Sequence, residues 1–359
     1  MALLIAPLVA LILALALTPI SMWLARRWDL LDRPGGRRQH KGRVPRIGGV
    51  ALFGGFAGAL LLMRLLPPAW LPPSTDPQEG WRVTGLLIGA AFVAAFGLAD
   101  DRFDFSSRTQ YIAQIVAALI AIAFTIFIER VNNPLPLGPD LLVFPWPLVW
   151  LLTIFWFMGA INTVNWLDGI DGLATTVSAI VAIVLAILML RMGQHSVAIL
   201  ALALLGSAVG FLFFNFPPAR VFMGSVGSYF LGFTLASLGL IAGARVATVL
   251  LVLGLPILDV AWLIWWRWRH GQPLGQGDRN HLHYRLLDKG YSQRQIVIGY
   301  AAFTAFFGAI SLITTSTIVK VIALLALLAA GGVIIWWASP REVAGGRPDS
   351  GQLADRPRD

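Results

Sequence analysis

Long apolar stretches dominate the pattern of hydrophobic and polar positions along this chain. A helix of roughly 17 to 25 apolar residues is long enough to cross the hydrocarbon core of a bilayer. Eleven such stretches are present, near 3–25, 48–66, 83–99, 111–129, 148–165, 173–190, 196–214, 224–242, 246–266, 295–313 and 318–337. They predict an all-α, polytopic membrane protein with about eleven transmembrane helices. The composition agrees, because 57% of the 359 residues are hydrophobic and only 13% are charged.

The basic residues predict the orientation of these helices. When the chain is threaded from an N-terminus outside the cell, 21 of the 27 lysines and arginines fall on one side and 6 on the other. The positive-inside rule makes the first side cytoplasmic, together with the C-terminus. One helix more or fewer would move all later loops to the other side, and most of this asymmetry would be lost. The asymmetry therefore supports the count of eleven helices. The first stretch has no basic residue before Arg26, so we expect a retained helix and not a cleaved signal peptide.

Charge and cysteine content limit the partners. The net charge of +9 comes from basic residues next to membrane helices, where lipid headgroups and phosphates are better partners than nucleic acid. The absence of cysteine excludes disulfides, Cys-ligated zinc and a thiol nucleophile. We expect one integral-membrane domain over 1–337 and a disordered cytoplasmic tail over 338–359.

Five groups of polar residues fall in the predicted cytoplasmic loops, near 26–47, 100–110, 165–172, 215–225 and 267–294. In the first loop, Arg37, Arg38, His40 and Arg46 are candidates for phosphate binding. Gly48 and Gly49 follow them and, because they have no side chain, would let the backbone come close to the phosphate. The alternative is a basic loop that only sets the topology.

The second group is acidic. Asp100 and Asp101 at the end of the third stretch could bind one Mg²⁺, or one could bind while the other accepts a proton. The alternative is that these residues simply solvate a helix end.

The third group combines amides and carboxylates. Asn162, Asn165 and Asp168 recur every three residues, which can align them along one stripe of a helix, and Asp171 lies in a break between Gly169 and Gly172. Hard oxygen ligands at a helix end suit Mg²⁺ and a nucleotide. Hydrogen-bonded helix capping is the competing interpretation.

The last two groups are candidates for anion and sugar contact. Asn215, Arg220 and Ser225 lie at a turn that leads into a glycine-rich helix start, which favours an anion, although turn chemistry alone would explain the composition. Near Arg279, His281 and His283 are expected on the same side of an extended strand, where phosphate or sugar contact is favoured over metal binding.

Taken in order, these motifs resemble the polyprenyl-phosphate N-acetylhexosamine-1-phosphate transferases, of the glycosyltransferase 4 type. The resemblance rests on Asp100-Asp101-x-x-Asp104, Asn162-x-x-Asn165-x-x-Asp168-Gly-x-Asp171-Gly and His281-Leu-His283, and runs from about Asp32 to Arg294. It implies a Mg²⁺-dependent enzyme, with Mn²⁺ as a substitute ion, in the inner (plasma) membrane with a cytoplasmic active site. The implied reaction transfers N-acetylglucosamine 1-phosphate, or a close relative, from a UDP-sugar to undecaprenyl or another polyprenyl phosphate.

The resemblance also implies roles. Asp100, Asp101 and Asp171 match catalytic positions, and Asn165 and Asp101 match metal ligands. The residues implied in substrate binding are Arg37, Arg38, His40, Arg46, Asp168, Asn215, Arg220, Arg279, His281 and His283. Expected partners are a UDP-N-acetylhexosamine, polyprenyl phosphate, membrane lipids and, in a homodimer, a second copy, with no nucleic acid.

Two positions depart from the family's pattern. Ser225 stands where the family has a metal-binding aspartate, and Tyr284 stands where it commonly has another histidine. A neutral hydroxyl should bind Mg²⁺ more weakly than a carboxylate. A catalytically impaired relative that still binds substrate is therefore the alternative, and a transporter is a more distant one.

Overall fold

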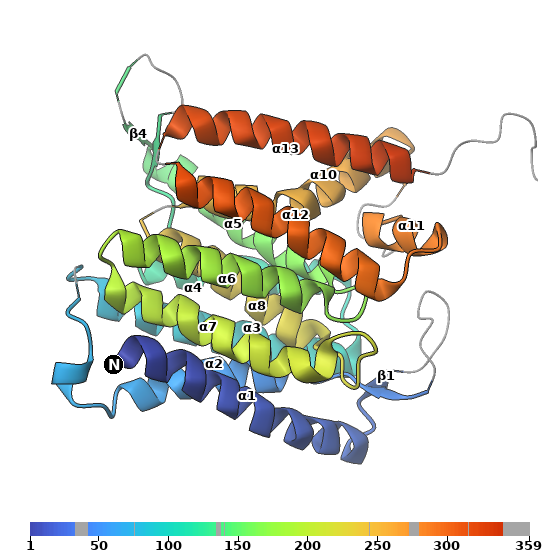
Figure 1. Ribbon diagram of the computed structural model, residues 1–359, viewed down its shortest axis with the longest axis horizontal. Coiled ribbons are helices and arrows are strands. Elements are labelled where there is room, and N and C mark those ends of the chain that lie inside the picture. The colour runs from blue at the N-terminus through green and yellow to red at the C-terminus, as the bar shows by residue number, and fades with distance from the viewer. Residues whose placement is uncertain are drawn as a thin grey trace, which may run out of the picture.

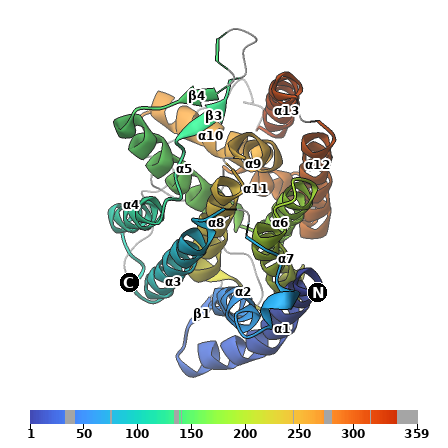
Figure 2. The same cartoon turned by 90° about the vertical axis from the view of Figure 1, so that its left-hand side faces the viewer.

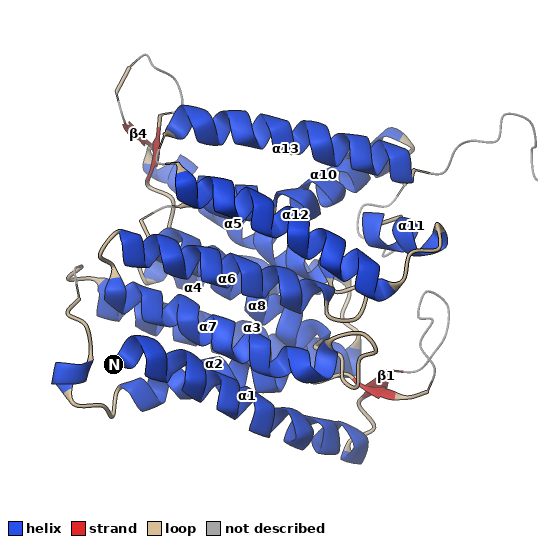
Figure 3. Cartoon of the chain, in the orientation of Figure 1, coloured by secondary structure: helices blue, strands red, loops and turns tan. Residues whose placement is uncertain are grey.

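The computed structural model describes residues 1–32, 42–74, 76–133, 138–139, 141–243, 245–272, 280–314 and 316–339. Helices dominate this part of the chain (Figure 3). They are α1 (Ala2–Arg27), α2 (Gly49–Met63), α3 (Glu79–Phe103), α4 (Ser107–Ala123), α5 (Trp146–Leu167), α6 (Leu173–Arg191), α7 (His195–Asn215), α8 (Gly224–Ile241), α9 (Val246–Val252), α10 (Gly254–Arg269), α11 (Leu282–Asp288), α12 (Gln293–Ile313) and α13 (Thr317–Ala338).

Strands are short and lie at the ends of the bundle. The pair β1 (Leu31–Asp32) and β2 (Val44–Pro45) is antiparallel, as is the pair β3 (Arg130–Asn132) and β4 (Leu141–Val143). A single 3-10 turn, Pro68–Trp70, follows α2 among the described residues. In Figure 1, β1 and α11 lie at one end of the bundle, and the N-terminus and β4 lie at the other.

Every predicted apolar stretch overlaps a helix, which confirms the all-α, polytopic class. Within the described ranges, eight helices are individually long and apolar enough to cross a bilayer, or nine if α9 and α10 form one broken span. The helices α2 and α4, with 15 and 17 residues, fall below that length. The count of eleven spans and the orientation of the termini therefore remain predictions.

Two stretches differ from the expected helices. The stretch 246–266 forms two helices, α9 and α10, which meet at a bend of 80°. Pro256 has no backbone N–H and cannot continue the hydrogen-bond ladder from α9. The stretch 111–129 is helical only to Ala123, because Thr125 adopts a positive φ of 58°, which a right-handed helix does not allow.

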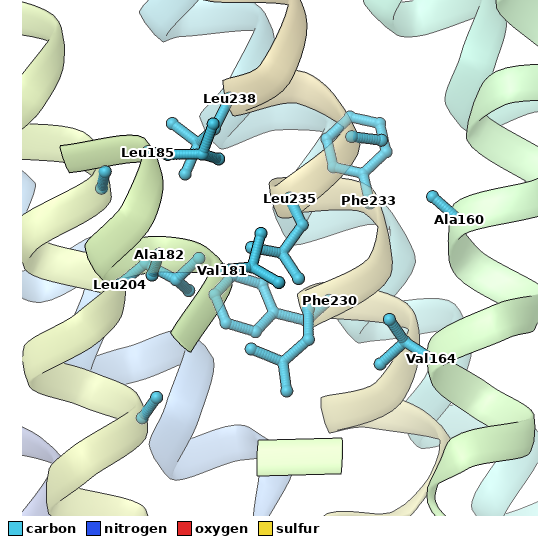
Figure 4. Close-up of a cluster of buried hydrophobic side chains, with 14 of the residues drawn as sticks. Ala160, Val164, Val181, Ala182, Leu185, Leu204, Phe230, Phe233, Leu235 and Leu238 are labelled. Atoms are coloured by element: carbon cyan, nitrogen blue, oxygen red, sulfur yellow. The ribbon is translucent and has the colours of Figure 1, made fainter. Parts of the chain in front are cut away.

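Helix α8 lies in the middle of the bundle, with α3, α5 and α6 around it (Figure 2). All of its residues are buried. Its large apolar side chains pack against α5, α6 and α7 (Figure 4), and the labelled members are Ala160, Val164, Val181, Ala182, Leu185, Leu204, Phe230, Phe233, Leu235 and Leu238. This packing fixes the start of α8, at Gly224, inside the protein.

Glycines allow two neighbouring helices to approach that start closely. A Cβ atom on Gly97 of α3 would lie 2.6 Å from the backbone of Ser225, and one on Gly49 of α2 would lie 2.1 Å from the backbone nitrogen of Gly227. Real side chains do not tolerate such distances, so the sequence requires glycine there. The contacts bring the end of α3 and the start of α2 against the first turn of α8.

We expect Gly97→Ala to lower the free energy of unfolding by about 1–3 kcal/mol, because the added methyl group overlaps the α8 backbone. Gly159→Ala in α5 is the matched control, since nothing lies within 4 Å of its Cβ position. Thermal unfolding of the purified protein in detergent measures both. Equal melting temperatures for the two variants would contradict the close contact between α3 and α8.

Candidate active site

Asp101, in the last turn of α3, accepts hydrogen bonds from the start of α8. The backbone N–H groups of Ser225 and Val226 donate to its two carboxylate oxygens, at 3.0 and 3.3 Å. The guanidinium Nε of Arg46 lies 3.0 Å from Oδ1 of the same carboxylate. A helix N-terminus carries partial positive charge. The negative charge of Asp101 is therefore balanced by both a helix end and an arginine.

Asp100 is enclosed by neutral hydrogen-bond donors. The Ser225 hydroxyl donates to Oδ2 at 2.7 Å and the Tyr229 hydroxyl at 3.4 Å. The Gln110 amide donates to Oδ1 at 3.0 Å, and the backbone N–H of Phe105 at 3.2 Å. With 6% of its surface exposed, Asp100 is a buried carboxylate whose oxygens are both bonded.

Backbone pairing holds Arg46 in place. Phe222 N–H donates to the Pro45 carbonyl at 2.8 Å, and the N–H groups of Gly48 and Gly49 donate to the carbonyls of Phe222 and Met223 at 2.9 Å. Gly224 directly follows Met223 and has a positive φ of 65°. A Cβ atom on this residue would lie 2.3 Å from Asp101 Oδ2. The segment before α2 is thus attached to the start of α8.

The end of α5 contributes Asn165, whose side-chain oxygen accepts a hydrogen bond from the Ser228 hydroxyl at 2.8 Å. Ser228 is one turn beyond Ser225 on α8, so Asn165 lies beside the acidic pair. Asn162 lies three residues earlier on the same helix, as the predicted stripe requires, and its amide exchanges hydrogen bonds with Gln114 of α4, at 2.7 and 3.1 Å.

The break after α5 occurs as predicted, with Asp168 at the C-cap and Gly172, at φ of 70°, before α6. Oδ2 of Asp171 accepts a hydrogen bond from the N–H of Ala219 at 2.9 Å, and its own N–H donates to Gln293 at 3.3 Å. The turn that follows α7 is therefore tied to this loop.

The carboxyl of Asp168 is electrostatically coupled to the other charged groups of the site. Burial raises the pKa of the Asp168 carboxyl well above its ordinary value, and the charge of Asp101 raises it further, against a smaller lowering by Arg46. These couplings place Asp168 within electrostatic range of Asp101 and Arg46.

The other predicted residues of the turn have different environments. Asn215 is buried, accepts a hydrogen bond from Thr175 at 2.8 Å and donates one to the Val221 carbonyl at 2.9 Å. Arg220 is exposed. Asn215 thus shapes the turn, and its contact with substrate stays a prediction.

The histidine loop is helical, which corrects the expected extended strand. His281 is the N-cap of α11, and His283 lies in its first turn. Their rings still face each other, with centroids 5.5 Å apart and planes within 6°. The extended conformation of the cap residue explains why the two rings share a side.

His283 contacts the loop after α5. A Cβ on Gly169 would lie 2.1 Å from its Nε2, so the glycine lets the imidazole approach the backbone. Burial lowers the pKa of His283 to about 3, and the neighbouring His281 contributes to the lowering. Among the described residues neither ring nitrogen has a hydrogen-bond partner. Burial therefore favours the neutral imidazole of His283, which lies against the backbone at Gly169.

The structure thus brings together Arg46, Asp100, Asp101, Asn165, Asp168, Asp171 and Ser225, with the two histidines of α11 against the same loop. Arg37, Arg38, His40 and Arg279 lie outside the described residues. Sequence reasoning missed Asp259 of α10, whose carboxylate lies 2.9 Å from His281 Nδ1. An aspartate inside an apolar run is costly, and that alone was a usable signal.

The expected metal ligands can be compared with these contacts. Asp101, Asn165 and Ser225 offer hard oxygen atoms, the kind that Mg²⁺ prefers. The set contains one carboxylate, and that carboxylate is paired with Arg46. In the described part of the chain, no group of three or more His, Cys, Asp or Glu side chains is arranged to hold a metal ion. The donors fit an ion that is bound mainly by water and substrate phosphates.

The fold and the site define a class: a polytopic membrane protein with carboxylates, amides and an arginine gathered at one end of its helical bundle. The family model for glycosyl transferase family 4 matches residues 83–243, a range that includes the acidic pair, the break after α5 and all of α8. Together with the relatives described next, this match shows that the chain belongs to that family.

Three curated relatives illustrate the similarity. The decaprenyl-phosphate N-acetylglucosaminephosphotransferase of Mycobacterium tuberculosis is 30% identical over 327 residues, covering 82% of this chain and 80% of the relative. A probable undecaprenyl-phosphate N-acetylglucosaminyl 1-phosphate transferase of Bacillus subtilis is 28% identical, with coverage of 82% and 80%. The undecaprenyl-phosphate alpha-N-acetylglucosaminyl 1-phosphate transferase of Salmonella typhi is 27% identical, with coverage of 78% and 76%.

We expect Ser225→Ala to destabilise the protein by about 1–2 kcal/mol, because Asp100 loses its shortest hydrogen bond while staying buried. Ser237→Ala is the matched control: this serine is also buried in α8, but its hydroxyl donates to a carbonyl of its own helix. Thermal unfolding in detergent compares them. If Ser225→Ala were no less stable than the control, Asp100 would not depend on the Ser225 hydroxyl.

Proposed function

We propose that the chain transfers N-acetylglucosamine 1-phosphate, or a closely related N-acetylhexosamine 1-phosphate, from its UDP-sugar to undecaprenyl or another polyprenyl phosphate. The products are polyprenyl-diphosphate-sugar and UMP. The observation that carries this proposal is the Asp101 carboxylate, held between Arg46 and the start of α8 and flanked by the Asn165–Asp171 loop. The names of the relatives support the same reaction.

The chemistry is a phosphoryl transfer between two anions. An oxygen of the lipid phosphate attacks the β-phosphorus of the UDP-sugar, forming one P–O bond. The bond from that phosphorus to the bridging oxygen breaks, and UMP leaves with the electron pair. The barrier comes largely from bringing the anions together and stabilising the charge that develops, so positioned cationic groups and N–H dipoles matter most.

The site offers such groups in fixed positions. Arg46 is held by the backbone bonds of Pro45, Gly48 and Gly49 to the start of α8, and can reach a phosphate next to Asp101. Asn165, held by Ser228, presents its amide at the same place. A lipid phosphate is mostly ionised near neutral pH, so Asp100 and Asp101 need not remove a proton, and their proposed role is to position the cationic partners.

Mg²⁺ is the proposed cofactor, with Mn²⁺ as a substitute. Asp101, Asn165 and the Ser225 hydroxyl would hold it together with the diphosphate of the UDP-sugar. Such an ion neutralises phosphate charge and stabilises the leaving group. Because the protein supplies few anionic ligands, we propose weak binding of the ion without substrate.

The location follows from the charge distribution. The elements β1 and α11, which lie at one end of the bundle (Figure 1), belong to the two sequence segments richest in lysine and arginine, 26–47 and 267–294. By the positive-inside rule we propose that this end faces the cytoplasm, where UDP-sugars are made, and that the protein resides in the inner or plasma membrane. The reaction would be the first membrane step in the synthesis of a cell-envelope glycan.

Asp101→Asn is expected to reduce turnover roughly 100-fold or more, because Arg46 loses the charge that positions it. Asp29→Asn is the control: it removes the same charge at an exposed residue whose positive φ of 51° asparagine tolerates. The assay incubates purified protein with UDP-N-acetylglucosamine, undecaprenyl phosphate and Mg²⁺, and measures UMP. Wild-type turnover matched by Asp101→Asn would contradict the proposed site. A folded wild-type protein without turnover would favour the impaired relative.

Ser225→Asp is expected to make the site more dependent on cations. The new carboxylate would face Asp100 and Asp101, with no hydroxyl to donate between them, so a dication should stabilise the variant much more than the wild type. Thermal unfolding with Mg²⁺ and with a chelator measures this directly, and UMP release at low Mg²⁺ should rise. An identical response to Mg²⁺ in both proteins would contradict a metal site at this position.

A further inference from the structure

Asp259 is a buried carboxylate that the reaction described above does not use. It lies on α10, which begins at Gly254 after the bend, and only 3% of its surface is exposed. The surrounding residues of the helix are mainly apolar, and a buried charge in such a segment is unfavourable unless it is fully paired. Its partners therefore indicate why the residue is there.

Those partners all belong to α11. Oδ2 lies 2.9 Å from Nδ1 of His281, Oδ1 accepts a hydrogen bond from the backbone N–H of Leu282 at 2.9 Å, and a guanidinium nitrogen of Arg285 lies 3.3 Å from Oδ1. Leu282 is the first residue of α11. Asp259 thus holds both the start of this short helix and the ring of its N-cap histidine.

The pairing determines which nitrogen of His281 carries a proton. An ionised carboxylate can only accept hydrogen bonds, so Nδ1 must donate to Asp259. In a neutral ring Nε2, on the opposite edge, is then an acceptor. An acceptor suits a hydroxyl or amide N–H group of a sugar, and it is unsuitable for a phosphate oxygen.

His281 borders the proposed reaction site. Its ring lies 5.8 Å from that of Trp166, the residue after Asn165, and it is parallel to His283, which contacts Gly169. Trp166, His281, His283 and Asp259 line one narrow crevice between α5 and α10, and only 3% of the Asp259 surface is exposed. The carboxylate is thus shielded from solvent, and water does not compete for its hydrogen bond with His281.

We propose that Asp259 is a positioning residue that fixes His281 as the Nδ1–H tautomer, so that Nε2 accepts a hydrogen bond from the N-acetylhexosamine of the UDP-sugar. The inference rests on the proposed function for the identity of the ligand. It assigns His281 to the sugar and leaves the diphosphate to Arg46 and the residues around Asp101.

A purely structural explanation must be separated from this one. Arg285 is also buried, and it donates to the Ser339 hydroxyl at 2.9 Å and the Ile335 carbonyl at 3.3 Å, at the end of α13. Asp259 could serve only to neutralise that arginine. In that case Arg285→Met should relieve the defect of Asp259→Asn, because no charge would remain unpaired. If Asp259 acts on His281, the double variant should stay as impaired as Asp259→Asn.

The test begins with the wild-type protein, which avoids any question of folding. The chain contains five histidines, and His281→Asn identifies the signals of one of them in two-bond proton–nitrogen correlation spectra of histidine-labelled protein. We expect His281 to show a protonated Nδ1 and an unprotonated Nε2 near neutral pH. A ring protonated on Nε2 alone, or on both nitrogens, would overturn the proposal.

The second part measures binding of UDP-N-acetylglucosamine and of UDP by calorimetry. Asp259→Asn and the Asp259→Asn, Arg285→Met double variant should each bind the UDP-sugar roughly tenfold more weakly, the effect of one lost hydrogen bond, and should bind UDP as the wild type does. Unchanged sugar binding in a folded variant, or recovery in the double variant, would contradict the positioning role.

The same experiment separates this inference from the proposed function. A wild-type protein that binds neither UDP nor the UDP-sugar would count against the function, while the tautomer of His281 would still decide whether Asp259 fixes the ring. A wild-type protein that binds and turns over substrate, with equal affinity in all variants, would count against the inference alone.

Discussion

The structure depends on keeping two adjacent carboxylates inside a helical membrane protein. Asp100 and Asp101 are removed from most of the surrounding water, and a buried carboxylate is strongly unfavourable without partners. The start of α8 supplies two backbone N–H groups and the Ser225 hydroxyl, and Arg46 supplies a positive charge. These bonds can form because α8 is buried in the centre of the bundle and because glycines let α2 and α3 pack closely against its first turn.

This arrangement explains why the site suits phosphate chemistry. Backbone N–H groups at a helix start and a fixed guanidinium stabilise anions whether these belong to the protein or to a ligand. The Ser225 hydroxyl changes the balance, because it donates a neutral hydrogen bond where a carboxylate would add charge. The hydrogen bonds and Arg46 together compensate the buried charge of the acidic pair.

How far the sequence determined this picture differs from residue to residue. Apolar length predicted the helices, because it reports a requirement that any bilayer-spanning segment shares. Glycine spacing predicted the break after α5, and Gly172 indeed has a positive φ. Spacing placed Asn162 and Asn165 on one helix, but their partners, Gln114 of α4 and Ser228 of α8, follow only from the tertiary structure.

The features that sequence reasoning did not reach depend on tertiary contacts. Asp259 of α10 contacts His281 and α11 although residues 270–281 separate the two helices in sequence, and no spacing rule links Asp259 to His281. The helical form of the histidine loop also depends on that contact, because α11 has only seven residues and gains its cap from another helix.

A structure of the protein with UDP-N-acetylglucosamine and Mg²⁺ bound, determined by electron cryomicroscopy, tests the central claim most directly. The account predicts the diphosphate beside Arg46 and Asp101, at the start of α8, with the sugar toward α11. A UDP-sugar bound at the opposite end of the bundle, or away from the acidic pair, would contradict it.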